Sequence, residues 1–528
     1  MVVRKDRIIA AGLVCVLLLL YGYSLTRSLV SPPSAYMSRE IPLAQAEYGF
    51  SKTVNSHVRT AVLPSGSSQY ILCVDGSRVL VLETDVQGKI LREQSFDLDL
   101  SRASLMQIST ASSQGLGVFF RTDALYRADL SMTTGEIKLQ NLTDKARYFD
   151  SDGESLVYGN RDGLFVLHPD YSEPVNIFPG SVLDFRLVCD GPGCYTLIIH
   201  EQSFDTVRME VLYCSPSVMD CTTLLSLDVS AKYFSDLQDL RLEGRELIAL
   251  YKYENGRNRT NEMMVQKIGL SGDKASILWQ QSTEVPLYHS NYRLMEGEGN
   301  DVRFIYQTDS SQGVNLAMAV MGSEGLISTH LLSKTKSMSK LGGAEVLEGR
   351  RVLVFSDINY EKRSLLFASS DPAVMESTSR FRTLPFWYPF LTTVLVYFVS
   401  LITGSLYLLV LLPVPVLVML ITEKLVFHRM ESPAPLQDSL ITLVHTAVKI
   451  VLTNMIISSA FNYSFQPAFI GAPAVLLTVV ILFTIPPVLL SLKKRGIDFY
   501  ISFAVYDYLF YTGLVVMYLT TSILLTKV

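Results

Sequence analysis

Hydrophobic and polar residues follow two different patterns along this chain of 528 residues. From about 36 to 382, short runs rich in Val, Ile, Leu, Tyr and Phe alternate with Gly, Asp, Asn and Ser, as in 78–83 and 163–168. Apolar runs bounded by turn residues predict β-strands, and long amphipathic helical patterns are nearly absent here. Towards both ends of the chain the pattern changes to long apolar runs. The sequence therefore predicts an all-β central domain between two apolar regions.

The central strands recur as a repeated unit. A unit opens with an apolar strand, passes a polar turn, continues with a second strand and closes with a Gly-centred hairpin, most clearly at 151–168 and again at 71–91. Similar units begin near Ile108, Phe185, Leu240, Val302 and Leu347. About seven units of roughly 40 to 55 residues are typical of a β-propeller, whose small sheets cannot bury their own faces and therefore stack radially.

Over about 54–380 the chain resembles the general β-propeller superfamily by this repeat architecture alone. No consistent Trp-Asp pair and no kelch double glycine recurs, so no named propeller family is assigned. The resemblance implies a propeller of about seven blades at 54–382, after a linker at 31–53. Six or eight blades, and a pair of β-sandwiches in place of the propeller, are the alternatives.

The terminal apolar runs have the length of transmembrane helices, which need about 20 residues. The first run, 8–25, follows a basic start and predicts an uncleaved signal anchor within 1–30, with a cleaved signal peptide as the alternative. The region 383–528 predicts a bundle of four transmembrane helices. These lie at about 386–426, 440–460, 468–492 and 500–525.

Charge bias orients these predicted spans, because Lys and Arg gather in cytoplasmic loops. With five crossings, the basic clusters at 4–7, 424–429 and 493–495 all fall on one side. Only 18% of residues are charged, below the quarter that is usual for soluble proteins, as membrane spans would require. The expected fold class is an all-β extracytoplasmic domain plus an α-helical transmembrane bundle. The expected location is an integral membrane protein with a cytoplasmic N-terminus and the β-domain on the extracytoplasmic side, whether periplasmic, extracellular or lumenal.

Four of the six cysteines form two closely spaced pairs in the central domain. They are Cys189, Cys194, Cys214 and Cys221. In an oxidising compartment such clustering predicts one or two disulfides, and reduced structural cysteines are the alternative. The spacings do not fit the CxxC knuckle of a zinc site. The connectivity stays open, and Cys73, inside an apolar run, is expected to be a buried core thiol.

One predicted membrane helix carries polar residues on a single face. They are Asp438, Thr442, His445, Lys449 and Thr453, spaced by three or four residues. Ionisable groups inside a membrane are costly, so they suggest pairing or function. Lys449 lies at a depth similar to that of Asp507 in the last predicted span, and we hypothesise an ion pair between them with His445 nearby. The alternatives are a Lys449 side chain that reaches the cytoplasmic interface, and a proton or solute path.

No catalytic motif is present: the chain lacks a Gly-x-Ser-x-Gly elbow, a His-Glu-x-x-His helix and a phosphate-binding loop. The histidines of the central domain are scattered, and we expect surface or structural roles for them. They are His57, His168, His200, His289 and His330. Asp75, Asp152 and Asp162 occur where turns favour Asp. We therefore expect no catalytic residue, cofactor or metal site and no nucleic-acid partner, and a non-enzymatic role is favoured.

The expected function is that of an interaction or scaffold subunit in a membrane or envelope complex. The propeller would recognise a protein or polymer, while the helices contact the lipid bilayer and other membrane proteins. One alternative is a transport, insertion or lipid-handling component that uses the C-terminal bundle. A second is a hydrolase or lyase carried by the propeller, which requires an acidic or histidine cluster at one propeller mouth.

Overall fold

The computed structural model describes most of 32–379 and a smaller set of residues elsewhere. Within 32–379 the undescribed residues are 48–57, 76–77, 101–102, 154, 168–173, 191–192, 204, 216–219, 231–233, 256–259, 273, 287–291, 298–299, 311–312, 336 and 359–361. Outside that range the described residues are 12, 16, 19, 391, 417, 421, 438–440, 442–447, 487–488, 491 and 498–508. The chain divides into two compact units, one of 32–379 and one that joins 1–31 to 380–528.

The 32–379 unit is built from four-stranded antiparallel blades that follow one another along the chain. The first three blades are β2 (Val58–Val62), β3 (Ser68–Asp75), β4 (Arg78–Asp85) and β5 (Ile90–Phe96); β6 (Leu105–Ser112), β7 (Gly115–Arg121), β8 (Leu125–Ser131) and β9 (Ile137–Thr143); and β10 (Tyr148–Asp152), β11 (Ser155–Gly159), β12 (Gly163–Leu167) and β13 (Val175–Pro179). The next two are β14 (Asp184–Asp190), β15 (Gly193–Ser203), β16 (Thr206–Ser215) and β17 (Asp220–Ser230); and β18 (Phe234–Glu243), β19 (Glu246–Asn255), β20 (Thr260–Ser271) and β21 (Lys274–Pro286).

The last two blades form one eight-stranded sheet. They are β22 (Arg293–Met295), β23 (Val302–Ser310), β24 (Gly313–Gly322) and β25 (Gly325–Leu331), then β26 (Met338–Leu347), β27 (Arg350–Ile358), β28 (Lys362–Ser369) and β1 (Ile41–Glu47). A single parallel pair, Val314 with Met338, joins the two blades. A short helix, α2 (Pro372–Ser379), follows β28.

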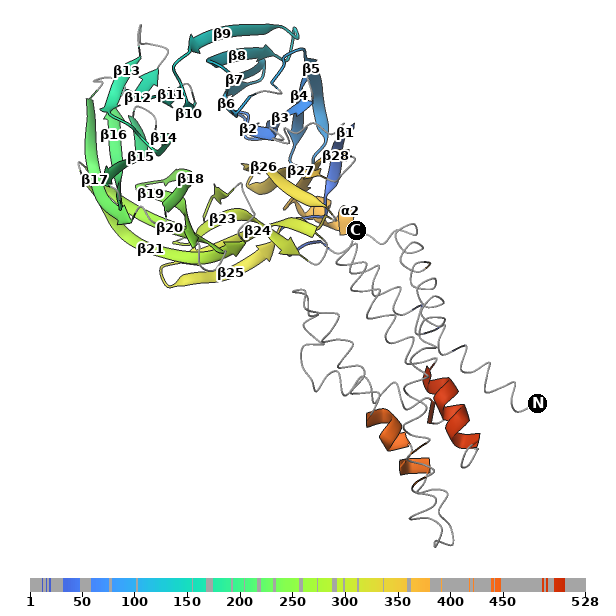
Figure 1. The fold of residues 1–528 in the computed structure, drawn as a ribbon. Coiled ribbons are helices and arrows are strands. Elements are labelled where there is room, and N and C mark those ends of the chain that lie inside the picture. Colours follow the sequence, from blue (N-terminus) through green and yellow to red (C-terminus); the bar gives the residue numbers. More distant parts are fainter. Residues whose placement is uncertain are drawn as a thin grey trace. The chain divides into compact units, whose positions relative to one another are not determined.

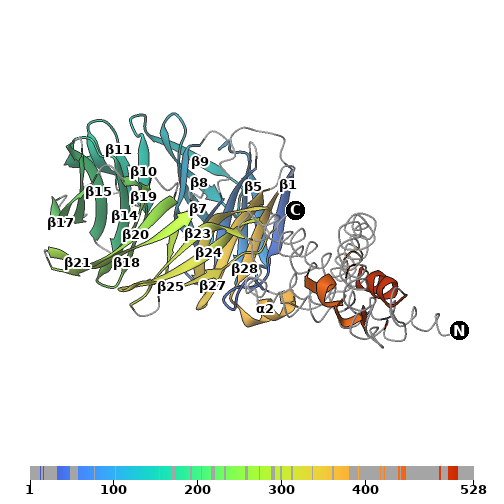
Figure 2. The ribbon, with the colours of Figure 1, turned by 60° about the horizontal axis from the view of Figure 1, so that its bottom comes forward.

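The seven blades stand in a closed ring (Figure 1). Each innermost strand contacts the innermost strand of the next blade, in the order β2, β6, β10, β14, β18, β22 and β26, and β26 contacts β2 again. In the turned view, β17 lies at the rim and β14 further in (Figure 2). The β-propeller-like repeats expected from the sequence are confirmed.

Strand β1 closes the ring, because it joins the three strands that come from the far end of the unit. It pairs antiparallel with β28. Just before it, the Ser38 amide donates to the Ser369 carbonyl at 2.9 Å, and the Ser369 amide donates to Ser38 Oγ at 3.0 Å. The segment 31–53, predicted as a linker, therefore contributes a strand of the last blade.

Every junction between neighbouring blades holds its own apolar core. The described residues of the 32–379 unit form seven clusters of buried side chains, and each draws on two adjacent blades. The cluster at the closing junction joins Val58, Ile71 and Cys73 of the first blade to Val354 and Phe367 of the last. Cys73 is thus the buried core residue that the sequence predicted.

Each outermost strand carries a one-residue β-bulge, and the extra residue is always Leu or Ile. In chain order these residues are Leu43, Leu91, Leu142, Ile177, Leu224, Leu278 and Ile327. A bulge turns its extra side chain out of the regular alternation of the strand. Because β1 shares the feature with the other six outermost strands, it is a true seventh member of the set.

The helical half of the predicted fold class is wrong: none of the helices that the structure describes is long and apolar enough to cross a membrane. The prediction of an integral membrane protein, with its signal anchor and its contact with the lipid bilayer, loses its support on the same finding. The greater parts of the predicted spans at 8–25, 386–426, 440–460, 468–492 and 500–525 lie outside the described residues.

A physical reason for this error is visible at 498–508. These described helical residues overlap the start of the predicted span at 500–525. Their apolar members Phe499, Tyr500, Phe503 and Ala504 pack into a cluster with Val488. An apolar run in a sequence does not reveal whether protein or lipid covers it.

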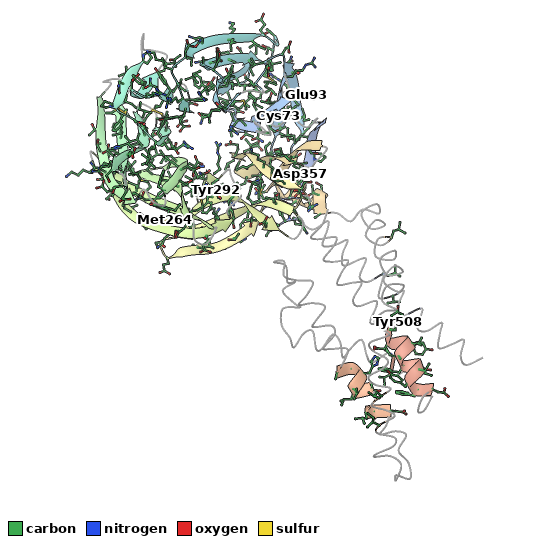
Figure 3. The ribbon with its side chains drawn as sticks, in the orientation of Figure 1. Cys73, Glu93, Met264, Tyr292, Asp357 and Tyr508 are labelled. Atoms are coloured by element: carbon green, nitrogen blue, oxygen red, sulfur yellow. A yellow bond between two sulfur atoms is a disulfide. The ribbon has the colours of Figure 1, made fainter. Side chains whose placement is uncertain are left out.

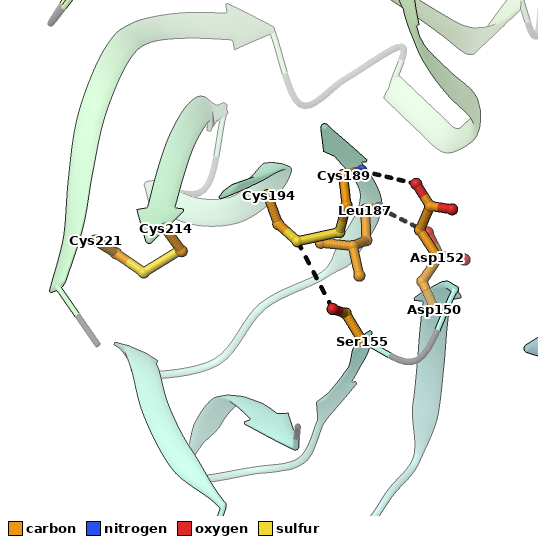
Figure 4. The surroundings of a disulfide bond; sticks show 8 residues. All are labelled: Asp150, Asp152, Ser155, Leu187, Cys189, Cys194, Cys214 and Cys221. Atoms are coloured by element: carbon orange, nitrogen blue, oxygen red, sulfur yellow. Dashed lines mark hydrogen bonds between the residues drawn. A yellow bond between two sulfur atoms is a disulfide. The ribbon is translucent and has the colours of Figure 1, made fainter. Parts of the chain in front are cut away.

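The four clustered cysteines lie in one row across the fourth blade (Figure 4). Cys189 faces Cys194, Cys194 faces Cys214, and Cys214 faces Cys221 on successive strands. The sulfur atoms of Cys189 and Cys194 are 2.05 Å apart, and those of Cys214 and Cys221 are 2.01 Å apart. The expectation of disulfides is supported, and the structure supplies the connectivity that the sequence left open.

We expect each of these disulfides to stabilise the blade by about 2 kcal/mol, the entropy of closing so short a loop in the unfolded chain. Replacing both cysteines of one pair by Ser should lower the free energy of unfolding by that amount in urea titrations of the oxidised full chain. Dithiothreitol should lower the free energy of unfolding of the wild type. It should leave that of a variant lacking these four cysteines unchanged. Equal effects of dithiothreitol on both proteins would contradict the assignment.

Candidate functional site

The seven innermost strands surround a central pocket with a volume of about 660 Å³. Its wall includes Tyr292, marked in Figure 3, and many charged side chains. The charged residues are Arg59, Arg186 and Arg293 together with Asp150, Asp152, Asp184, Asp236 and Asp239. This acidic cluster at the centre of the ring is the feature that the hydrolase or lyase alternative required, so its bonding decides what it can do.

Two of the pocket aspartates join the third blade to the fourth. Asp150 Oδ2 accepts the Leu187 amide at 2.7 Å, and Asp152 Oδ2 accepts the Cys189 amide at 2.7 Å (Figure 4). Both carboxylates extend from β10, and both amides belong to β14, the innermost strand of the next blade. Ser155 Oγ, on β11, adds a contact to Cys194 Sγ at 3.9 Å.

The same bond recurs at the next two junctions. Asp184 Oδ2 accepts the Leu237 amide at 2.8 Å, and Asp239 Oδ2 accepts the Leu294 amide at 2.8 Å. Glu243, at the end of β18, accepts the Gly297 amide at 3.1 Å. An innermost strand has no strand partner along one edge, and an unsatisfied buried amide is costly. Acidic residues of the preceding blade satisfy these amides.

Other polar side chains bond across the remaining junctions. Arg59 Nε donates to the Met106 carbonyl at 2.9 Å, and Gln107 Nε2 donates to Asp150. Gln307 Nε2 donates to the Ser339 carbonyl at 2.6 Å. At the closing junction, Thr60 Oγ1 donates to Glu345 Oε1 at 2.7 Å. Each of the seven junctions therefore has a polar bond as well as an apolar core.

Burial and mutual attraction set the ionisation of this cluster. Burial raises the pKa of the Asp150 and Asp184 carboxyls, and Arg186 opposes that rise. Burial alone would lower the pKa of the Arg186 guanidinium, but Asp184 and Asp150 outweigh it and the pKa is raised. Burial, and then Arg293, lowers the pKa of Arg59 to about 10. The central charges thus hold one another in place.

The sequence interpretation placed some of these residues correctly and missed others. Asp162 lies in the bend between β11 and β12, as a turn residue should. Asp152 has a role beyond the predicted turn, because it binds the next blade. Asp150, Asp184 and Asp239 were not singled out. The sequence does contain a signal for these three residues. In each case an Asp stands beside a buried aromatic residue or Leu in the first strand of a unit, where alternation alone would favour an apolar residue.

The described histidines do not gather at the central pocket. His200 on β15 lies 3.6 Å from Glu210 on β16, and His330 on β25 bonds to Ser328 at 2.9 Å. The other three central histidines, at 57, 168 and 289, lie outside the described residues. No group of three or more metal-ligating side chains occurs among the residues that the structure places.

Part of the predicted polar face comes together in the other unit. His445 Nε2 lies 3.0 Å from Asp507 Oδ2, and both side chains are 1% exposed. Phe503 presents its ring edge-on to the imidazole at a centroid distance of 5.0 Å. Asp438 is buried, and Thr442 Oγ1 donates to its carbonyl at 2.8 Å.

The hypothesis of a Lys449–Asp507 ion pair stays a prediction, because 449 and 453 lie outside the described residues. His445, which that hypothesis placed nearby, is itself a hydrogen-bond partner of Asp507. We therefore propose that His445 and Asp507 form a buried pair that fixes 442–447 against 498–508.

No protein-family model and no curated protein matches the chain. Among solved structures, the chain is similar to one from the crystal structure of BBS1N in complex with ARL6DN, soaked with lead, at 12% identity and a TM-score of 0.39, covering 63% of this chain and 97% of that one. It is also similar to a chain of the mitotic checkpoint complex, at 9% identity and a TM-score of 0.38, covering 63% and 94%. TM-scores and identities this low support no functional conclusion.

We expect Asp150→Asn to lower the free energy of unfolding by about 1–3 kcal/mol. Asp150 accepts one hydrogen bond on each carboxylate oxygen, so in the variant one of these two buried donors would face an amide NH₂ and lose its acceptor. The folded-state pKa of Asp150 lies above the unfolded value, so its contribution is complete below the ordinary pKa of about 4 and is lost as pH rises through the raised pKa. The deficit of the variant should therefore shrink as pH rises above about 4 in urea titrations. The stability deficit of Asp184→Asn should likewise shrink as pH rises. A deficit that grows with pH would contradict the rise in carboxyl pKa caused by burial.

We expect His445→Ala and Asp507→Ala to be coupled by about 0.5–3 kcal/mol in a double-mutant cycle, because each variant strands the other buried group. Urea unfolding of the full chain, followed by circular dichroism, measures this coupling. Asp498→Ala, an exposed position on the same helical stretch, serves as the control and should not couple to His445. If Asp507→Ala couples to Lys449→Met and does not couple to His445→Ala, the Lys449–Asp507 ion pair is favoured.

Proposed function

We propose that this chain is a protein-interaction subunit whose seven-bladed ring is a rigid platform for another protein. The observation that carries the proposal is a group of exposed aliphatic side chains on two neighbouring outermost strands. They are Ile277 and Leu278 on β21, and Leu326 and Ile327 on β25, between 39% and 59% exposed. Grouped apolar side chains on a surface favour a binding partner, whereas single ones need no explanation.

The rigidity of the ring supports this proposal. Every junction between blades is fixed by a buried apolar cluster and by at least one polar bond between the two blades. Loops and outer strands held on such a scaffold keep their shape, and the entropy lost on binding is correspondingly small. A platform of this kind suits recognition of a folded or extended protein segment.

No observation on the described residues favours the hydrolase or lyase alternative. The acidic cluster that it requires surrounds the central pocket, but Asp150, Asp152, Asp184 and Asp239 accept backbone amides there. Asp236 lies 3.7 Å from Lys252 Nζ. Carboxylates used in this way hold the blades together and are poorly placed to move a proton on a substrate.

Site-specific photocrosslinking of the full chain in its source cells tests the proposal. A benzophenone amino acid would replace Leu278, Ile327, Leu91 or Leu139, one at a time, since all four are about half exposed. We expect one or a few discrete protein adducts from Leu278 and Ile327, identified by mass spectrometry. Absence of protein adducts from every position, or an identical smear from all four, would contradict an interaction role.

A further inference from the structure

A second pocket, with a volume of about 430 Å³, lies between the outermost strands of the fifth and sixth blades. Leu278 and Trp279 of β21 form one side, and Ile327 of β25 forms the other. Asp301 and Glu324 lie on its wall as well. Trp279 is partly buried and packs against the core of the same two blades, so the base of the pocket is continuous with that core.

Comparison of the seven bulges shows why this pocket is unusual. Leu43, Leu142 and Ile177 are half-buried and Leu224 is buried, so protein covers the bulge residue in those blades. Leu91 is 47%, Leu278 51% and Ile327 59% exposed. Of these three, Leu278 and Ile327 belong to neighbouring blades and line one pocket. Two exposed side chains of a class that is covered in four of the seven blades therefore flank one unfilled space.

The charges around the pocket indicate the chemistry of its occupant. Lys267 is 3% exposed, and its Nζ lies 2.7 Å from Glu246 Oε2, so these two opposite charges compensate each other. Asp301 and Glu324 add two further negative charges to the wall. A pocket that combines the apolar side chains of Leu278, Trp279 and Ile327 with a net negative charge is complementary to an apolar group beside a cation.

The strand β25 adds a backbone template. Among the described strands it pairs only with β24, so its second edge faces away from the sheet. Beyond the bulge at Ile327, the regular part of β25, 328–331, offers amides and carbonyls to an extended segment, and pockets for alternate side chains then give specificity. The occupant that fits is an extended peptide.

We propose that the β21–β25 pocket binds an extended segment of a protein partner in which an aliphatic residue is flanked by Lys or Arg. The aliphatic side chain lies between Leu278 and Ile327 over Trp279, and the cationic neighbours face Asp301 and Glu324. This inference rests on the proposed interaction function and names the class of segment that the ring recognises.

The test measures binding of a fluorescein-labelled nine-residue peptide of alternating Leu and Lys to the full chain by fluorescence anisotropy. Companion peptides carry Glu in place of Lys, or Ser in place of Leu. Ile327→Ser removes the apolar contact, and Leu91→Ser is its matched control, a bulge residue on the first blade that is also about half exposed. Glu324→Lys reverses a pocket charge, and Glu93→Lys does the same on the exposed face of β5.

We expect Ile327→Ser and Glu324→Lys each to weaken binding of the Leu–Lys peptide by about tenfold or more, with Leu91→Ser and Glu93→Lys unchanged. Affinity should also fall with added salt, because the rim charges are exposed to solvent. No binding by the wild type, equal loss in the matched controls, or equal binding of the Glu peptide would each overturn the site.

The two proposals fail separately. If protein adducts form in cells but the peptide does not discriminate among these variants, the interaction function stands and this pocket is not its site. If Ile327→Ser abolishes both the adducts at Leu278 and the peptide binding, while circular dichroism shows an unchanged fold, both proposals are supported together.

Discussion

The whole ring depends on one constraint: each small sheet has two apolar faces, and only its neighbours can cover them. Burial of these faces supplies most of the favourable free energy of such folds, so no blade is stable alone. Seven apolar clusters, one at each junction, are the result. The last face is covered only when the two ends of the unit meet, which gives β1 its place beside β28. There the strands approach so closely that a Cβ on Gly343 would lie 1.6 Å from Thr60 Oγ1.

Closing the ring creates a second problem on the inside. The innermost strands converge with one edge unpaired, and their amides need acceptors that strand pairing cannot give. Asp150, Asp152, Asp184 and Asp239 meet this need, each across a junction. The dense charge of the central pocket is therefore largely a consequence of assembly. A pocket of this appearance invites a catalytic interpretation, and its hydrogen bonds argue against one.

The outside of the ring has the opposite problem, since each outermost strand presents a free edge. A bulge with a Leu or Ile interrupts that edge in every blade, which both twists the strand and offers an apolar side chain. In most blades that side chain is covered. At β21 and β25 two of them stay about half exposed around one pocket, and the proposed recognition of a cationic, aliphatic segment depends on this local departure from the repeat.

The sequence by itself determined the local features: strands, turns, the repeat, the buried Cys73 and the two cysteine pairs. Each follows from alternation, turn residues or spacing, which act over a few neighbouring positions. Tertiary structure decided the rest. Strand β1 was missed because its partner lies over 300 residues away, and Asp150, Asp184 and Asp239 were missed because their acceptor role exists only across a junction. A hydrophobic pattern records that side chains must be covered, and the folded chain alone decides what covers them: Phe499, Tyr500, Phe503 and Ala504 pack with Val488.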